Sequence, residues 1–319
     1  MITPKENMRR VITGDGKPEW MPIASEDFDI VYPSELHERP PFGQDGYDWY
    51  GVRWTFEHGF MSFVQDPTQP LICGDITQWK EKVKLPDYSQ YDWKAAAERD
   101  LAHADRENKM LRIFLECGAW ERFHSLVGFE EAFVYMYEEP ECFKELMQAL
   151  TDSRKELIMT IYDAYHPDVI FDMNDLGSAK SSFMSPAMYR EFIQPYQKQL
   201  VDVCHELGMF YLMHSCGTVD NLFADMIETG ADVIQPVQGC NDWKKVKAIS
   251  DGKVAIEGAR HLRTEDLDAD EADIRADIRS AIDIFAGNKR FIFDDYCLIP
   301  RNKEIMVDEA KQYGAELYT

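Results

Sequence analysis

The chain has 319 residues, of which 45% are hydrophobic and 13% aromatic, so it can bury a sizeable core and is not a disordered chain. Its 58 acidic residues outnumber its 34 basic ones, which gives a formal net charge of −24. A field of that sign repels phosphate backbones and anionic lipid headgroups. We therefore expect neither nucleic acid nor a membrane among its partners.

The N-terminal segment has no apolar stretch after its positive charges, so it does not read as a secretory signal. No window holds the roughly 18 uninterrupted apolar residues that a membrane span needs. Seven cysteines are spread from Cys73 to Cys297 without a compact framework, which is typical of reduced thiols, some of them metal ligands. These features predict a soluble cytoplasmic protein.

The chain begins with a helix near Pro4–Thr13 and a strand near Trp20–Ser25, as their apolar patterns indicate. The following segment, from about 26 to 93, does not fit the later repeat. It is rich in prolines and contains an aromatic cluster of Trp49, Tyr50, Trp54 and Phe56. We interpret it as an insertion folded over one mouth of the domain.

Beyond this segment, short apolar runs alternate with amphipathic ones, as buried parallel strands alternate with helices. The expected strands are Leu111–Cys117, Asp168–Asp172, Met209–His214, Asp232–Pro236, Lys253–Glu257 and Arg290–Asp294. One helix follows Pro140, a second runs on from the cap Ser185 to Gly208, and a third starts in the acidic run Glu265–Asp273 and stops at Gly287.

The number of strand–helix units approaches eight, and no Gly-x-Gly-x-x-Gly follows a strand. The pattern thus predicts a single α/β domain over residues 1–319, a closed TIM (β/α)8 barrel with the insertion near its catalytic mouth. Enzymes of this architecture place their chemistry at the C-terminal strand ends. Polar residues expected there are Asp172, Asn174, His214, Cys216, Gln235, Glu257, Asp294 and Cys297.

Three of these residues form a candidate zinc set. His214 and Cys216 are two residues apart on an extended chain, so their side chains point the same way. Cys297 follows the last strand, and one His with two Cys leaves a fourth position open, as in catalytic zinc sites. The alternative is that the cysteines are small buried thiols and His214 an ordinary barrel-mouth histidine. Cys240, in a strand-end loop, is the substitute ligand if Cys297 is not one.

Several stretches resemble the uroporphyrinogen decarboxylase superfamily, and within it the zinc-dependent, corrinoid-linked methyltransferases. They are DWYGVRW from Asp48, ITQWKEKVKLPD from Ile76, FMSPAMYREFIQPY from Phe183, HSCGTVDNL from His214, GADVIQP from Gly230 and FDDYCLIP around Cys297. The resemblance covers almost the whole chain. It implies a TIM barrel, and zinc at His214, Cys216 and Cys297.

The resemblance also implies an activity. We expect a methyl group to move from a small methoxylated, aromatic compound to a Co(I) corrinoid. The corrinoid is expected on a separate partner protein, because this chain has no Asp-x-His-x-x-Gly corrinoid-binding stretch. The alternative is transfer from a methyl-corrinoid to a small thiol, in which zinc lowers the pKa of the thiol. Weaker alternatives are a decarboxylase and a non-catalytic protein that docks a corrinoid protein. A homodimer is a further expectation that rests on no particular residue.

The decarboxylase alternative is weak because those enzymes carry an arginine-containing stretch near the N-terminus that holds the carboxylates of the substrate. Here the corresponding region, residues 24–35, reads ASEDFDIVYPSE and is acidic. A chain of this charge without those cations would repel a substrate with many carboxylates.

The remaining candidates have both a functional and a structural interpretation. Asp172 either orients His214 as a hydrogen-bond partner or caps the following helix. The side chain of Asn174 is expected to point the same way as that of Asp172, and the side chain of Asp175 the opposite way. Related methyltransferases often have two adjacent acids where this chain has Asn174 and Asp175. Asp172, Asn174 and Glu257 are the candidate catalytic residues, and Gln235 and Glu257 are expected to fill or approach the open zinc position. Substrate contacts are expected from Trp54, Trp120, Glu121 and Gln235. The alternative roles are packing for the two tryptophans and a helix N-terminal charge for Glu121.

Overall fold

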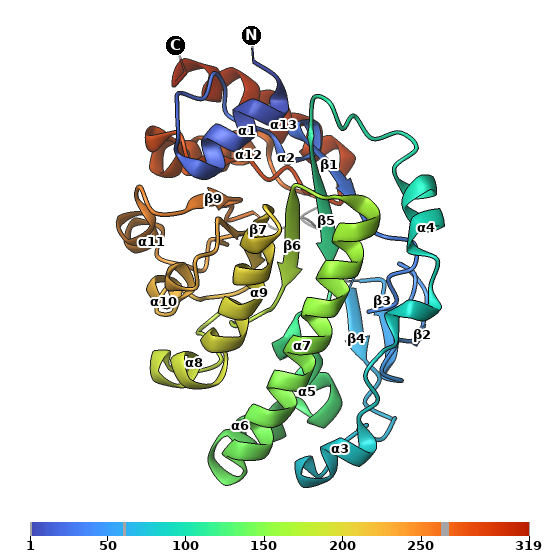
Figure 1. Ribbon diagram of the computed structural model, residues 1–319. Helices are drawn as coiled ribbons and strands as arrows, with labels where there is room; N and C mark the ends of the chain where they lie inside the picture. The colour runs from blue at the N-terminus through green and yellow to red at the C-terminus, as the bar shows by residue number, and fades with distance from the viewer. Residues whose placement is uncertain (1, 60–61, 263–267, 319) are drawn as a thin grey trace.

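The computed structural model describes residues 2–59, 62–262 and 268–318. Over these residues the chain forms one seven-stranded parallel sheet and one three-stranded antiparallel sheet (Figure 1). In their spatial order, the strands of the large sheet are β1 (Phe28–Val31), β5 (Met110–Leu115), β6 (Val169–Met173), β7 (Phe210–His214), β8 (Val233–Gln235), β9 (Ala255–Glu257) and β10 (Phe291–Ile292).

Helices surround the curved sheet. They are α1 (Pro4–Thr13), α2 (Ala24–Asp27), α4 (Trp93–Asp100), α5 (Ala119–Val127), α6 (Phe129–Glu138), α7 (Pro140–Tyr165), α8 (Pro186–Phe192), α9 (Gln194–Glu206), α10 (Phe223–Glu228), α11 (Trp243–Ser250), α12 (Glu271–Phe285) and α13 (Pro300–Glu316), with a short 3-10 turn, η3 (Ala286–Asn288), after α12. None of the helices in the described ranges is long and apolar enough to cross a membrane.

The large sheet curls into a partial barrel of the TIM type, as the alternation of strands and helices predicts. In place of an eighth strand, Ile23 forms a parallel bridge to Phe293, just beyond β10. The amide of Ala24 donates to the carbonyl oxygen of Phe293 at 2.9 Å, and the amide of Phe293 donates to that of Pro22 at 2.8 Å. The segment before β1 is thereby joined to the last strand.

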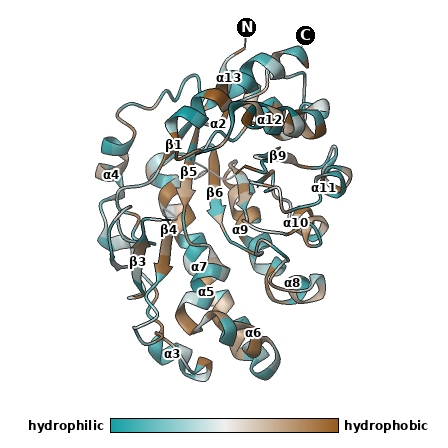
Figure 2. Cartoon of the chain, turned by 180° about the vertical axis from the view of Figure 1, so that it is seen from behind, coloured by the Kyte–Doolittle hydropathy of each residue, from teal (hydrophilic) through white to brown (hydrophobic). Residues whose placement is uncertain are grey.

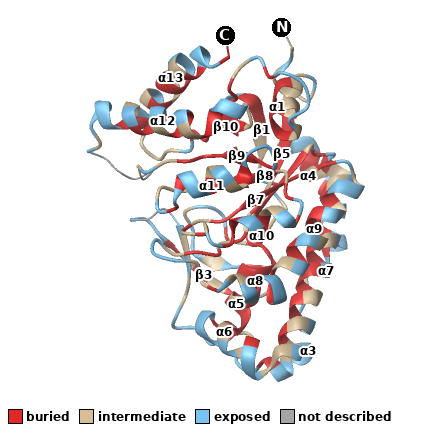
Figure 3. Cartoon of the chain, turned by 90° about the vertical axis from the view of Figure 1, so that its left-hand side faces the viewer, coloured by how far each residue is buried: buried red, intermediate tan, exposed pale blue. Residues whose placement is uncertain are grey.

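The barrel interior is filled by alternate residues of the strands, as expected for a strand period of two. Phe28, Phe171, Leu212 and other inward residues form one buried cluster, which also includes Met8 of α1. Helix α1 therefore closes the N-terminal end of the barrel. The arrowheads of β5 and β6 point to the opposite end, toward α5, α6 and α8 (Figure 1). Figure 2 shows these strands as hydrophobic, and Figure 3 shows strands and inner helix faces as buried.

The segment between β1 and β5 contains the small antiparallel sheet. Its elements are β2 (Gly46–Tyr47), β3 (Arg53–Glu57), β4 (Ser62–Gln65), η1 (Ile76–Gln78), α3 (Trp79–Lys82) and η2 (Tyr88–Gln90). This insertion is joined to the barrel helices by buried ion pairs, Asp48 with Arg122 of α5 and Glu38 with Arg154 of α7. Removing one partner of such a pair typically costs about 3–5 kcal/mol of stability. The insertion is thus firmly attached to α5, next to the C-terminal end of β5.

Three elements differ from the sequence prediction. The strand expected near Trp20–Ser25 is reduced to the single bridge at Ile23, and α2 begins at the next residue. Strand β1 lies within the segment that we interpreted as an insertion. The sequence pattern did not reveal it, because the outward Asp29 and the acidic residues before it interrupt the apolar pattern of the inward residues Phe28 and Ile30. The helix expected from Ser185 to Gly208 is two helices, α8 and α9. They meet at Ile193, because Pro195 has no amide hydrogen to continue the first helix.

The third predicted helix is present as α12, which begins at Glu271 after the cap Asp270. Its predicted start at Glu265 lies outside the described residues.

Candidate metal centre

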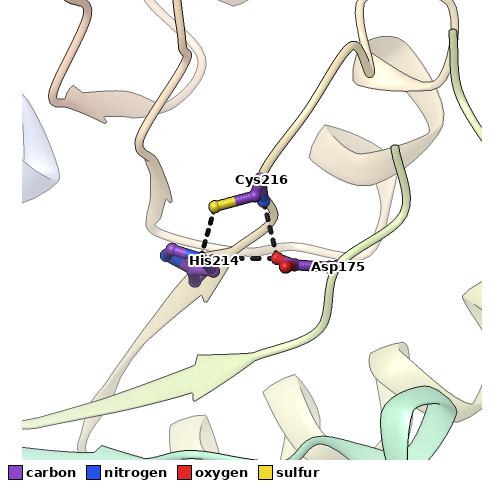
Figure 4. A group of neighbouring side chains, drawn as sticks. All are labelled: Asp175, His214 and Cys216. Carbon is purple, nitrogen blue, oxygen red and sulfur yellow. Dashed lines mark hydrogen bonds and ion pairs between the residues drawn. The ribbon is translucent and has the colours of Figure 1, made fainter. Parts of the chain in front are cut away.

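Three potential metal ligands meet at the C-terminal edge of the sheet (Figure 4). They are Asp175, His214 and Cys216, and one ligand atom from each lies within 4.8 Å of the others. The Cys216 Sγ is 3.3 Å from the His214 Nε2, and the Asp175 Oδ1 is 3.4 Å from the same nitrogen. An imidazole nitrogen, a thiolate and a carboxylate are all zinc ligands.

Local backbone geometry explains why His214 and Cys216 meet. His214 ends β7, where it lies beside Met173 of β6 and Gln235 of β8. The chain remains extended for one more residue, because the amide of Ser215 donates to the carbonyl oxygen of Gln235 at 2.9 Å. His214 and Cys216 therefore point to the same side, as the two-residue period predicts.

Asp175 reaches the group from the neighbouring strand end. The alternation along β6 predicts that it points away from Asn174, but the chain leaves the strand after Met173, so that alternation no longer applies. Its carboxylate accepts a hydrogen bond from the backbone amide of Cys216 at 2.7 Å. Asp175 is the member of the group that the sequence prediction did not include. Its signal in the sequence was its place next to Asn174, where the methyltransferases that the sequence resembles often have two adjacent acids.

Gln235 sets the orientation of His214. Its side-chain oxygen accepts from Nδ1 of the imidazole, and its nitrogen donates to the Asp294 Oδ2 at 3.0 Å. In the neutral form of the ring that binds a metal, the proton is then on Nδ1 and the lone pair of Nε2 faces Cys216 and Asp175. Gln235 thus has the orienting role that the sequence suggested for Asp172, and it lies on the side of the ring away from the other ligands.

Gln238 holds the loop that carries Cys216. Its side-chain oxygen accepts from the amide of Gly217 at 2.7 Å, and its nitrogen is 3.6 Å from the Cys216 Sγ. A donor of this kind stabilises a thiolate. The sequence prediction did not identify Gln238, because a glutamine in a loop has no distinctive spacing.

The charges of the group are coupled. Burial alone would lower the pKa of His214, but Cys216 and Asp175 raise it well above its usual value. Burial would raise the pKa of Asp175, but the hydrogen bond and charge of His214 lower it. Burial raises the pKa of the Cys216 thiol. A cation that binds here must therefore displace protons from both the thiol and the imidazole, which makes its affinity depend on pH.

Glu121, at the start of α5, lies directly behind Asp175. One of its oxygens accepts the backbone amide of Asp175 at 3.0 Å, and the other accepts from the Arg39 Nη2 at 3.0 Å. Burial and the neighbouring charge of Asp175 raise the pKa of Glu121 to about 7. The predicted residue is therefore next to the metal ligands, in contact with the backbone of one of them.

Glu257 lies inside the barrel, where both its oxygens accept from Nη1 of Arg112 at 2.8 Å. Burial raises the pKa of Glu257 to about 7, against the opposing charge of Arg112. The residue stands at the end of β9 as predicted, but it belongs to this ion pair and not to the metal-ligand group.

Asp172 and Asn174 have structural partners. Asp172 accepts from Arg154 and from the Tyr211 hydroxyl at 2.6 Å, on the side of β6 that faces the helices. Asn174 accepts from the amide of Trp120 at 3.1 Å and so caps the first turn of α5. Neither side chain hydrogen-bonds to His214. Their predicted catalytic role has no contact in this structure that supports it.

Two aromatic residues predicted to contact substrate are buried. Trp120 has 0% of its surface exposed and packs against Phe123 and Phe133. Trp54 is buried too, with its indole nitrogen donating to the Asp48 Oδ2 at 2.7 Å. As arranged here, neither ring offers a free face.

The structure does not bring Cys297 into the ligand group. The residue follows β10 as predicted, and its Sγ is 3.6 Å from the carbonyl oxygen of Ile299. The substitute ligand Cys240 is exposed and likewise outside the group. Cys297 as a zinc ligand therefore remains a prediction from sequence.

The comparisons with known proteins agree with this fold. The family model described as Uroporphyrinogen decarboxylase (URO-D) matches residues 82–307. Among solved structures, a methyltransferase from Methanosarcina mazei has a TM-score of 0.69 at 13% sequence identity, covering 98% of this chain and 99% of that one. At such low identity this similarity concerns the fold alone.

Other structural similarities are weaker. A uronate isomerase from Bacillus halodurans has a TM-score of 0.38 at 10% identity, covering 66% of this chain and 50% of that one, which is too low to support a conclusion. A comparison with curated protein sequences found no match. The family match extends over more than half of the chain, and the chain therefore belongs to the uroporphyrinogen decarboxylase (URO-D) family.

Proposed function

We propose that this protein is a zinc-dependent methyltransferase that moves a methyl group from a small methoxylated aromatic compound to the Co(I) corrinoid of a partner protein. The observation that carries the proposal is the group of Asp175, His214 and Cys216 at the catalytic end of a TIM-type barrel. The fold similarity to the M. mazei methyltransferase and the URO-D family membership support it.

The donors fit zinc in their chemistry. His214 and Cys216 would hold the ion, with Asp175 as the third ligand in the present geometry and Cys297 as the ligand predicted from sequence. When bound, zinc would supply an electrophilic centre that polarises the ether oxygen of the methyl donor. A set of three protein ligands leaves the fourth position for that oxygen.

The residues of the chain have separate tasks in this proposal. Gln235 keeps the imidazole of His214 oriented, with its proton on Nδ1. Glu257 has no part in proton transfer in this proposal, because both its oxygens are held by Arg112 inside the barrel. After the methyl cation equivalent leaves, the donor oxygen retains the electron pair and takes one proton from water.

A row of aromatic side chains that ends beside His214 supports the proposal that the methyl donor is aromatic. Tyr32, just after β1, is 54% exposed, and its ring centroid is 4.6 Å from that of Phe114. Phe114 stacks on Phe171 at 4.0 Å, and Phe171 is 5.2 Å from the His214 ring. An incoming aromatic ring can extend this row at its exposed end, which the buried Trp54 and Trp120 cannot offer.

The proposal is tested by metal analysis and a methyl-transfer assay. Purified protein should contain about one zinc per chain by elemental mass spectrometry. Loaded protein should convert free cob(I)alamin to methylcobalamin with a methoxybenzoate as donor, followed by absorbance. Zinc without turnover on any methoxy compound, but with methylation of a thiol by methylcobalamin, would favour the alternative activity, transfer from a methyl-corrinoid to a small thiol. No zinc even after reconstitution would refute the metal-dependent mechanism.

A further inference from the structure

Arg39 connects the insertion to the metal centre. It lies between β1 and β2, and its Nη2 donates to the Glu121 Oε2 of α5 at 3.0 Å. The two side chains are only 10% and 7% exposed. The guanidinium also lies over the Trp54 ring, 3.7 Å from its centroid, a distance at which a cation is attracted to the ring face. Arg39 is therefore held in one position by two contacts inside the protein.

The chain of contacts continues from Glu121 to the metal ligands. The second oxygen of Glu121 accepts the backbone amide of Asp175 at 3.0 Å. The carboxylate of Asp175 in turn accepts the amide of Cys216 at 2.7 Å and lies 3.4 Å from the His214 Nε2. A residue of the insertion thus reaches the ligand group through one intermediate side chain.

The charges explain why a cation is needed at this point. Glu116, Glu121 and Asp175 are carboxylates close enough to feel the charge of Arg39. Two carboxylates such as Glu121 and Asp175 repel each other in a desolvated site. A guanidinium on Glu121 offsets this repulsion, and its planar donors fix the direction of the carboxylate.

We propose that Arg39 is a positioning residue of the metal centre. It holds Glu121 so that the second oxygen of that side chain fixes the backbone of Asp175, and with it the Asp175 carboxylate beside His214 and Cys216. Trp54 supports Arg39 from behind. This inference rests on the metal site of the proposed function. It means that the insertion contributes a residue that positions a metal ligand.

The test is the zinc affinity of purified protein, measured by competition with a chromophoric zinc chelator. Loss of a residue that orients a metal ligand typically lowers affinity 10- to 100-fold, so we expect at least a tenfold loss in Arg39→Gln. Arg53→Gln is the matched control. Arg53 is another insertion arginine, with its Nε 3.1 Å from Asp66 and its guanidinium over the Tyr47 ring. We expect its affinity to equal that of the wild type.

A spectroscopic readout separates positioning from general destabilisation. In the Co(II)-substituted protein, the visible absorption bands report the ligand geometry around the ion. They should shift in Arg39→Gln and stay unchanged in Arg53→Gln. Unchanged zinc affinity and an unchanged cobalt spectrum in folded Arg39→Gln would overturn the inference.

A double-mutant cycle tests the route through Glu121. Glu121→Ala should weaken zinc binding by itself, and adding Arg39→Gln should then have no further effect. If Arg39→Gln does not fold, Glu121→Ala alone decides, and wild-type affinity in that variant would overturn the inference. A wild-type protein that binds no zinc would instead refute the proposed metal site, so the two failures are distinguishable.

Discussion

The Cys216 Sγ and the His214 Nε2 lie 3.3 Å apart at the end of β7, on the same side of an extended segment. Both atoms also face Asp175, which arrives from the end of β6 (Figure 4). Two ligands therefore follow from one strand, whereas the third depends on how the next strand is placed.

Asp175→Asn should weaken zinc binding at least tenfold, because the amide keeps the hydrogen bond to the Cys216 backbone but loses the charge that the ion requires. The measurement is chelator competition, with Cys297→Ser compared under the same conditions. An unchanged affinity in Asp175→Asn together with a loss in Cys297→Ser would show that the ligand set predicted from sequence is the correct one.

Asp172→Asn should lower the free energy of unfolding by about 2 kcal/mol, because Arg154 then loses one of its two buried charged partners and keeps Glu38. Zinc affinity should stay within twofold of wild type, since Asp172 faces the helices. Urea unfolding and chelator competition check the two expectations. Asp163→Asn, exposed on α7, is the control. Loss of zinc in folded Asp172→Asn would instead support its predicted role at the metal.

Tyr32→Ala should raise the KM for a methoxybenzoate by about tenfold at most, because a stacked aromatic pair contributes ~0.5–1.5 kcal/mol. The kcat at saturating donor should not change, because Tyr32 lies outside the metal-ligand group. Tyr137→Ala removes an exposed ring of α6 and serves as the control. A lower kcat with an unchanged KM in Tyr32→Ala would contradict a ring contact at this position.

Glu309→Gln should destabilise the α12–α13 pair at neutral pH by about 2 kcal/mol. Burial alone would raise the pKa of Glu309, but hydrogen bonds from Arg279 and Arg275 lower it. The ionised form therefore contributes stability above the pKa of the unfolded chain, and this contribution is lost as pH falls through the folded pKa.

The free energies of unfolding of wild type and Glu309→Gln should accordingly converge as the pH falls below about 4.5, the ordinary glutamate value. Denaturant unfolding at several pH values measures this difference. Glu304→Gln, an exposed position on the same helix, should show no such dependence. A difference that persists at low pH would mean that the contribution of Glu309 comes from packing and not from its charge.

Local sequence patterns were sufficient for the parts of the protein in which neighbours along the chain decide the structure. Continuous apolar runs predicted β5 to β10, because strands buried on both faces need apolar residues at successive positions. The two-residue period predicted that His214 and Cys216 face the same side. Strand β1 and the break between α8 and α9 were missed, since acidic residues conceal the first and Pro195 interrupts an otherwise regular helical pattern.

Contacts between distant segments decided the rest. Asp175 joins His214 because β6 and β7 are neighbours in the sheet, and Gln235 orients the imidazole because β8 lies on the other side. Arg39 reaches Glu121 across 82 positions of sequence. No local period carries such information, because a side-chain pairing between segments exists only after strand order and insertion packing bring them together. The sequence alone thus determined the barrel and two of the candidate metal ligands, and the tertiary structure decided which residues surround and orient them.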